Sequence, residues 1–251
     1  MPLRFVPLGV GDAFSERRYS CSVAIEADDG LLLVDCPHPI LKMLREAREE
    51  TGLELRADRI DAVVLTHLHA DHSSGLESLA YYTHFALRRR LPLVVHPAVL
   101  ARLWEGHLAA GMEQLLPYVG GEPIKKTLED YFEILLLRDD GPVQAGPFSI
   151  ECRATIHHIP TTAVRVHAGG ASLGLSADTC FDEGLIAWLT EADLAIHETN
   201  HGIHTPYSSL AALPAETRAR MRLIHYPDDF DLAASQITPL EERRVYSVAR
   251  P

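Results

Sequence analysis

The most unusual feature of the sequence is a dense group of residues of metal-binding types. The segment T-H-L-H-A-D-H places the imidazoles of His67, His69 and His72 close to the carboxylate of Asp71, all within the six residues 67–72. Residues two apart in an extended segment point to the same side, so His67 and His69 can bind one ion together. Asp71 and His72 follow where a helix is expected to begin, and they can turn towards a second ion. Imidazole nitrogens with carboxylate oxygens suit zinc, iron or manganese rather than calcium.

This segment resembles the signature of the metallo-β-lactamase-fold hydrolases, a family whose site is dinuclear. A second run, L-G-V-G-D-A at residues 8–13, is similar to the opening motif of the RNase Z branch of that family and of related phosphodiesterases. The resemblance extends along most of the chain. It implies an α/β fold, an αββα four-layer sandwich built from two pseudo-symmetric halves, with the metals at one end.

The same resemblance implies a full set of metal ligands, namely His67, His69, Asp71, His72, His157, Asp178 and His225. In the segment I-H-H-I-P-T-T, the register of the family motif selects His157. The adjacent His158 is the alternative, because the two would point opposite ways from a strand. Asp178 in S-A-D-T would bridge both ions, although Ala177 replaces the usual glycine of the family. His225 follows a short apolar strand, as the final histidine of the family does.

A second cluster of polar residues, I-H-E-T-N-H-G-I-H-T-P, follows another buried strand. It resembles two motifs of the RNase Z branch, H-E-A-T and a later H-S-T, which nearly touch here. The match implies that Glu198 orients His204, and that His204 protonates the leaving oxygen as a general acid of near-neutral pKa. With Asp71 they form the candidate catalytic set. The alternative is that His197, His201 and His204 are supporting or surface residues.

Strands and helices must bring these clusters together. Short apolar runs predict strands at residues 61–65, 192–196 and 223–224, directly before the first histidine cluster, before the second cluster and before His225. Helices are predicted over residues 39–51, 75–87, 97–120, 183–190 and 214–221. Strands and helices alternate without a low-complexity linker, which predicts one α/β domain spanning residues 1–251.

The composition of the chain argues against several classes of protein. Its 251 residues are 47% hydrophobic, which is typical of a globular domain. The 23 Lys and Arg against 35 Asp and Glu give a net charge of −12, and this makes long nucleic acids unlikely ligands because cationic side chains bind phosphates. The four cysteines form no C-x-x-C pair. No apolar run is long enough for a membrane span, so no membrane partner and a cytoplasmic location are expected.

Together the motifs predict a dinuclear metal-dependent hydrolase that binds two divalent ions, zinc in the first instance, or manganese or iron. The ions would lower the pKa of a bridging water, and the resulting hydroxide would attack a small phosphodiester. A lactone or another ester is the alternative substrate of the same site. A di-iron oxygen-binding or redox protein is a different class, disfavoured because such relatives tend to carry a glutamate where this chain has His69. The expected partner is a small-molecule substrate, and a homodimer is left open.

Overall fold

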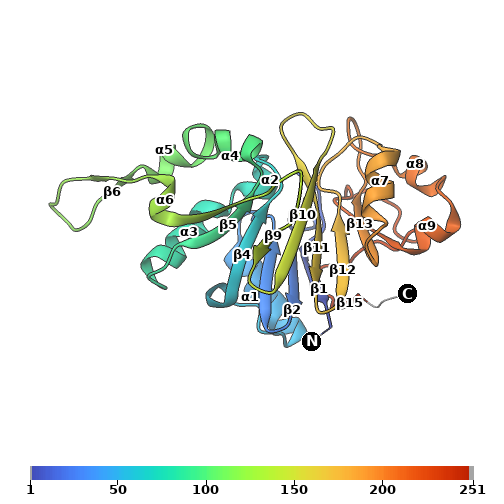
Figure 1. Ribbon diagram of the computed structural model, residues 1–251, viewed down its shortest axis with the longest axis horizontal. Helices are drawn as coiled ribbons and strands as arrows, with labels where there is room; N and C mark the ends of the chain where they lie inside the picture. The colour runs from blue at the N-terminus through green and yellow to red at the C-terminus, as the bar shows by residue number, and fades with distance from the viewer. Residues whose placement is uncertain (1, 249–251) are drawn as a thin grey trace.

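The computed structural model describes residues 2–248. Two β-sheets lie face to face at the centre of the molecule, and helices cover the outer face of each (Figure 1). The layers therefore follow one another as helix, sheet, sheet and helix. This arrangement confirms the predicted α/β class and the four-layer αββα sandwich.

The first sheet comes from the first half of the chain, with one short strand added from the end. Its order is β15-β1-β2-β3-β4-β5-β8, and the bounds are β1 (Arg4–Gly9), β2 (Ser22–Ala27), β3 (Gly30–Val34), β4 (Ile60–Leu65), β5 (Leu91–Val95), β8 (Phe132–Leu136) and β15 (Tyr246–Ser247). The first three strands form an antiparallel meander, and β3, β4, β5 and β8 are parallel. Parallel neighbours need crossover connections. These contain α1 (Ile40–Thr51), α2 (Ala70–Ser73), α3 (Leu76–Phe85), α4 (Pro97–Leu103) and α6 (Leu128–Tyr131).

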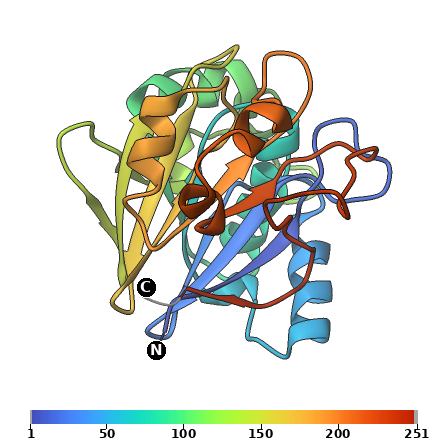
Figure 2. The same cartoon turned by 90° about the vertical axis from the view of Figure 1, so that its right-hand side faces the viewer.

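The second sheet repeats this plan in the second half of the chain (Figure 2). Its order is β14-β13-β12-β11-β10-β9, and the bounds are β9 (Val143–Ala145), β10 (Phe148–Ala154), β11 (Thr162–Ala168), β12 (Ala171–Leu175), β13 (Leu194–Glu198) and β14 (Met221–Ile224). An antiparallel meander again leads into parallel strands, β12 to β14. The connecting helices are α7 (Glu183–Leu189), α8 (Tyr207–Ala211) and α9 (Ala215–Ala219).

Side-chain alternation along the strands explains how the layers hold together. In β3, Leu31 and Leu33 join the core between the first sheet and its helices, whereas Leu32 and Val34 join the core between the two sheets. A third apolar cluster lies between the second sheet and its helices. Strands buried on both faces carry continuous apolar runs, as the sequence L-L-L-V does. The two sheets are thus fixed against each other, and so are the loops at their ends.

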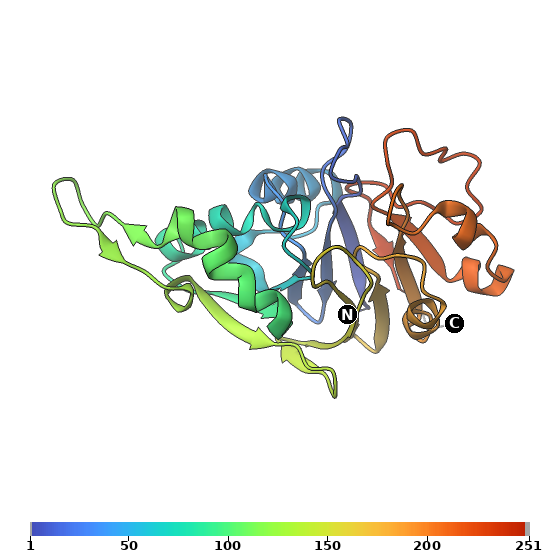
Figure 3. The same cartoon turned by 90° about the horizontal axis from the view of Figure 1, so that it is seen from above.

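The predicted helix over residues 97–120 is wrong after Met112. The chain forms α4, a π-helical turn over Trp104–Leu108 and α5 (Ala109–Met112), and then a hairpin of β6 (Gln114–Leu115) and β7 (Ile124–Lys125). Pro117 and the pair Gly120-Gly121 lie between these strands, where they favour a turn over a helix. The hairpin projects away from the body of the molecule (Figure 3).

Two predictions from composition can be compared with the structure. All four cysteines, which form no C-x-x-C pair in the sequence, are free thiols in the structure. Within residues 2–248, none of the helices has both the length and the apolar character needed to cross a bilayer.

Candidate dinuclear metal centre

The candidate ligands meet at one end of the two sheets because each follows the end of a strand. The histidine-rich segment follows β4, Asp178 follows β12, and His225 follows β14. His157 lies in the connection between β10 and β11, and Glu198 is the last residue of β13. Parallel strands present their carboxyl ends at the same edge of a sheet, and ligand sites of α/β proteins form there. The face-to-face packing then brings both edges together.

One group of donor atoms is formed by three imidazoles and one carboxylate oxygen. His69 Nδ1 lies 3.1 Å from His67 Nε2 and 3.1 Å from His157 Nε2. The Oδ2 atom of Asp178 lies 3.7 Å from His67 Nε2 and 3.6 Å from His157 Nε2. Two donors bound to one tetrahedral zinc at about 2.1 Å would be roughly 3.4 Å apart. The spacing of this group therefore fits a single small cation.

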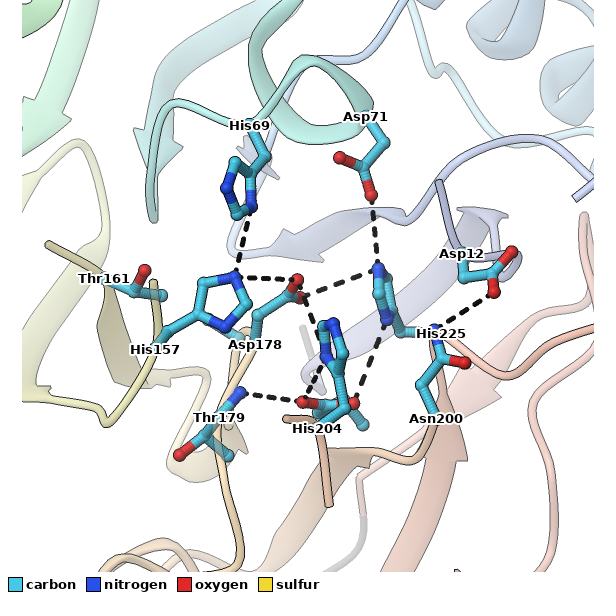
Figure 4. Close-up of polar contacts among 12 residues, drawn as sticks. Asp12, His69, Asp71, His157, Thr161, Asp178, Thr179, Asn200, His204 and His225 are labelled. Atoms are coloured by element: carbon cyan, nitrogen blue, oxygen red, sulfur yellow. Dashed lines mark hydrogen bonds and ion pairs between the residues drawn. The ribbon is translucent and has the colours of Figure 1, made fainter. Parts of the chain in front are cut away.

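A second group of donor atoms lies on the other side of Asp178 (Figure 4). Asp71 Oδ2 is 3.4 Å from His72 Nε2 and 3.2 Å from His225 Nε2. The Oδ1 atom of Asp178 is 3.2 Å from His72 Nε2 and 3.6 Å from His225 Nε2. The two oxygens of one carboxylate thus face two different groups of donors. Such an arrangement suits two cations that share Asp178.

Unpaired polar atoms support this fit. His72 Nε2 and Asp178 Oδ1 are buried, and although they lie 3.2 Å from each other, neither makes a hydrogen bond. Buried polar atoms are nearly always paired, because an unpaired one loses its interaction with water without compensation. Both atoms point into the cluster, where a cation would satisfy them. The residues present therefore fit a two-metal centre in three respects: the type of donor atoms, their spacing, and the buried polar atoms that lack a hydrogen bond.

Asp35, which sequence reasoning missed, orients His72. Its Oδ2 atom lies 2.7 Å from His72 Nδ1, and its Oδ1 atom accepts hydrogen bonds from the backbone N–H and the hydroxyl of Thr66. Thr66 Oγ1 also lies 3.0 Å from His67 Nδ1. These contacts keep the protons on the outer nitrogens, so that Nε2 of each ring faces the cluster. Asp35 directly follows β3, so the strand-end position was its available signal.

The protonation preferences of the cluster follow from burial and from neighbouring charges. Burial lowers the pKa of His67 well below its ordinary value, and it lowers the pKa of His157 to about 4. Burial also disfavours charged His72, but Asp178 and Asp35 outweigh it and raise the pKa of His72 well above the ordinary value. Burial disfavours ionised Asp178, yet His225 and His72 hold its pKa well below the usual range. Asp178 is therefore an anion that cations can neutralise.

Glu198 and His204 form a pair beside the two donor groups, and a nitrogen of His204 lies within 4.8 Å of donor atoms of Asp178 and His225. His204 Nδ1 lies 2.8 Å from Glu198 Oε1, which also accepts a hydrogen bond from the backbone N–H of Thr179 at 2.7 Å. Burial lowers the pKa of His204, but the Glu198 carboxylate outweighs it, and the net shift is upward. His204 Nδ1 is 3.9 Å from Asp178 Oδ2, farther than from Glu198. The pair is thus built to hold a proton next to the cluster.

The structure places the alternative histidines outside the cluster. The side chain of His157 is 1% exposed and faces the donors, whereas His158 is exposed and its ring centre is 6.3 Å from that of His69. His197 is buried and its Nδ1 donates to the Glu198 carbonyl at 2.7 Å. His201 is exposed. The seven predicted ligands and the pair Glu198–His204 therefore come together, and the other histidines do not.

The family of the chain follows from comparison with known sequences. A family model described as anti-Pycsar protein Apyc1 matches residues 3–242. The chain belongs to this family. An Apyc1 protein of Paenibacillus sp. (strain J14) is 30% identical over 266 residues and covers 99% of this chain and 100% of its own. Another Apyc1 protein, from Bacillus phage 010DV004, is 30% identical over 238 residues and covers 89% of each chain.

Solved structures place this Apyc1 family member in the metallo-β-lactamase fold, as the motifs predicted. The metallo-β-lactamase fold protein YhfI of Bacillus subtilis superposes with a TM-score of 0.76 at 21% identity, over 98% of this chain and 99% of that one. The short form of human tRNase Z gives a TM-score of 0.67 at 23% identity, over 98% of this chain and 99% of that one. Identities this low show the shared fold alone.

Proposed function

We propose that the chain is a two-metal phosphodiesterase that hydrolyses small phosphodiesters, with 3′,5′-cyclic nucleotides as the substrate class to test first. The observation that carries the proposal is the position of Asp178, whose two oxygens face two separate groups of donors. The proton-holding pair of Glu198 and His204 lies beside it. A phosphodiester needs both features, because charge develops on its phosphoryl oxygens and on its leaving oxygen.

In this proposal, His67, His69 and His157 would hold one divalent cation, Asp71, His72 and His225 would hold the second, and Asp178 would be available to both. Bound divalent cations lower the pKa of water and neutralise charge on phosphoryl oxygens. The chain supplies the fixed geometry, because Asp35 and Thr66 orient two of the imidazoles. Zinc is the first expectation for a set of imidazoles and carboxylates, with manganese or iron as alternatives.

The remaining steps fall to side chains at the cavity of about 360 Å³ that opens onto the cluster. Water adds to phosphorus and loses a proton to solvent, and the bond between phosphorus and the leaving oxygen breaks. His204, protonated and held through Nδ1 by Glu198, donates the Nε2 proton to that oxygen. Burial raises the pKa of Asp71, but hydrogen bonds with His225 and His72 outweigh it and lower the pKa overall. Asp71 therefore stays ionised and orients the attacking water.

The net charge of −12 disfavours a long polyanion as the ligand. The cavity lined by His69, His157 and His204 has the volume for a small ligand. These observations support a small diester over a long nucleic acid.

The test is a turnover screen of zinc, manganese and iron forms against bis(p-nitrophenyl) phosphate, 3′,5′-cyclic nucleotides, lactones and p-nitrophenyl esters. We expect both kinds of diester to be hydrolysed, with two metal ions per chain by elemental analysis. Protein carrying Asp178→Ala, purified in parallel, controls for contaminating phosphodiesterases. Turnover of lactones or esters alone would replace the proposal with the alternative substrate. Two bound iron ions with a visible charge-transfer band and no hydrolysis would indicate redox chemistry.

A further inference from the structure

A loop between β1 and β2 brings an exposed aromatic ring to the mouth of the candidate site. Ala13 and Phe14 line the same cavity as His69, His157 and His204. Phe14 is nevertheless 88% exposed, more than most of the large apolar side chains at the surface. Exposed apolar area costs roughly 25 cal/mol per Å², so a phenyl ring held in water gains nothing for folding. Its position at the cavity points to a ligand that covers it.

The loop that carries Phe14 is fixed on the side that follows the ring. The carboxylate of Asp228 accepts hydrogen bonds from Ser15 Oγ at 2.6 Å and from Arg18 Nη1 at 2.7 Å. It also accepts from the backbone N–H groups of Glu16 and Arg17, at 2.7 and 3.1 Å. Asp228 lies three residues after His225, so these bonds tie the loop to the segment that supplies a candidate ligand. Figure 2 shows the two segments side by side.

The loop is also fixed on the side that precedes the ring. Asp12 Oδ1 accepts a hydrogen bond from the backbone N–H of Phe14 at 3.0 Å, and Asp12 Oδ2 accepts one from Asn200 Nδ2 at 3.0 Å (Figure 4). Gly11 permits the tight return, because a Cβ there would lie 2.7 Å from Ser15 Cβ. The backbone of Phe14 is therefore held from both directions, and its exposure is a property of a constrained loop.

Asn200, which lines the same cavity as Phe14, already has its side-chain polar atoms engaged. Asn200 Oδ1 accepts from the backbone N–H of His201 at 2.7 Å, while its Nδ2 donates to Asp12. Asn200 thus holds the loop, and its side chain has little remaining capacity to form hydrogen bonds with a ligand. Phe14 offers a flat apolar face, and aromatic faces bind nucleobases by stacking. The chemistry at the mouth of the cavity therefore favours a planar group over a sugar or an alkyl chain.

We propose that Phe14 is a specificity-determining residue that stacks on the nucleobase of a nucleoside phosphodiester whose phosphate lies at the metal centre. This inference rests on the proposed phosphodiesterase function and adds the group that the cavity mouth recognises. It leaves the reaction itself unchanged, because Phe14 touches the base and not the reacting atoms. The expected signature is a preference for diesters that carry a base.

The first experiment measures that preference as a ratio. For wild type, Phe14→Ala and Phe14→Leu, kcat/KM is determined with cyclic AMP and with the 3,5-cyclic phosphate of 1-deoxyribose, which has the same ring diester without a base. Stacking by one aromatic side chain corresponds to about 5- to 150-fold in binding. We expect the ratio to fall by at least fivefold in both variants. Phe85→Ala, which removes a 45% exposed phenyl ring on α3 outside this cavity, is the matched control and should leave the ratio unchanged.

The outcomes separate the two proposals. If wild type hydrolyses neither diester, the proposed function fails. If wild type hydrolyses both diesters but Phe14→Ala lowers both rates equally, or neither, the stacking role is refuted and the function stands. Retention of the ratio in Phe14→Leu with its loss in Phe14→Ala would indicate simple apolar contact and would also overturn stacking.

A binding measurement tests stacking before turnover. Metal-loaded Phe14→Trp protein is mixed rapidly with cyclic AMP and with the base-free analogue, and the initial change in indole fluorescence is compared with that of wild type, which has two tryptophans of its own. A stacked base should quench the added indole, and the base-free analogue should not. Absence of quenching at millimolar nucleotide would refute the stacking role even if no substrate is turned over.

Discussion

Asp178 is the side chain on which both donor groups depend. Asp178→Ala removes both of the oxygens that face them, so we expect loss of metal and a fall in turnover of more than about 100-fold, because even residues that only orient metal ligands are worth about 10- to 100-fold. Elemental analysis and kcat/KM with a diester measure the two effects, and circular dichroism should show an intact fold. Asp140→Ala, at an exposed turn, is the control. Two metals at full occupancy with near-normal rates would show that another group bridges.

His204 can be tested through the leaving group. A departing alkoxide has a high pKa and needs a proton, which a positioned acid supplies at a gain of about 10²- to 10⁴-fold, whereas p-nitrophenolate departs unassisted. His204→Ala should therefore slow an alkyl diester far more than a p-nitrophenyl diester, with metal content unchanged. His201→Ala, an exposed neighbour, should slow neither. Equal losses on both substrates would assign His204 to binding or structure, and loss of metal would make it a ligand.

His197 links the pH dependence of stability to one buried ring outside the donor groups. Burial lowers its pKa to about 4 in the folded chain, against about 6.5 when unfolded. The unfolded chain binds more protons between these values, so His197 destabilises the fold as pH falls through this window. Acidification from pH 7 to 4.5 should lower the free energy of unfolding of the wild type by about 2 kcal/mol more than that of His197→Asn, whose side chain cannot titrate. Urea unfolding of metal-depleted protein measures the difference, and equal losses would contradict the assignment.

At the scale of elements, the sequence was most informative where chemistry and strand ends coincide. The motifs at His67, Asp178 and His225 each follow an apolar run, and that rule predicted their convergence. Asp35 obeys the same rule but was missed, because a single aspartate after a strand carries no motif. The hairpin over residues 114–125 was missed for a different reason. The predicted helix was extended past Met112 into the hairpin. In the structure, the hairpin side chains Leu116, Tyr118 and Val119 are exposed, so a helix there would have no core to pack against.

The connection from β12 to Asp178 contains the departure from the family motif, Ala177 in place of glycine. Ala177 adopts φ of +51°, the left-handed conformation that glycine adopts without strain. A residue with a Cβ destabilises the folded chain by about 1–2 kcal/mol in this conformation. Replacing it with glycine would remove that cost, but the greater freedom of glycine in the unfolded chain would cancel about half of the gain. Ala177→Gly should therefore stabilise the protein by about 0.5–1 kcal/mol in urea unfolding, with unchanged turnover. Ala101→Gly, exposed within α4, should destabilise it. A loss of stability in Ala177→Gly would show that the methyl group packs.

At the scale of the whole molecule, several basic side chains bind carbonyl or carboxylate groups of the chain itself. Arg89, in the densest basic run of the sequence, donates to the carbonyls of Ala57 and Ile60. A second basic region, on a groove of about 460 Å³ beside α1, includes Arg45 and Arg56. Both pair with acidic neighbours, among them Glu49 and Asp58. Arg45, Arg56 and Arg89 are therefore already engaged within the fold, and the chain as a whole carries a net charge of −12.

This charge distribution predicts that the protein does not bind transfer RNA, although the short form of human tRNase Z shares its fold. Nonspecific binding to nucleic acid comes from cations that displace counterions, and with Kd values of about 10⁻⁴ to 10⁻⁶ M it weakens steeply as salt rises. Fluorescence anisotropy of labelled transfer RNA should show no binding at 10 µM protein, at either 50 or 150 mM salt. The same preparation should still hydrolyse a small diester, which shows that the protein is active. Binding below 10 µM with a steep salt dependence would reveal a cationic surface and return long RNA to the candidate substrates.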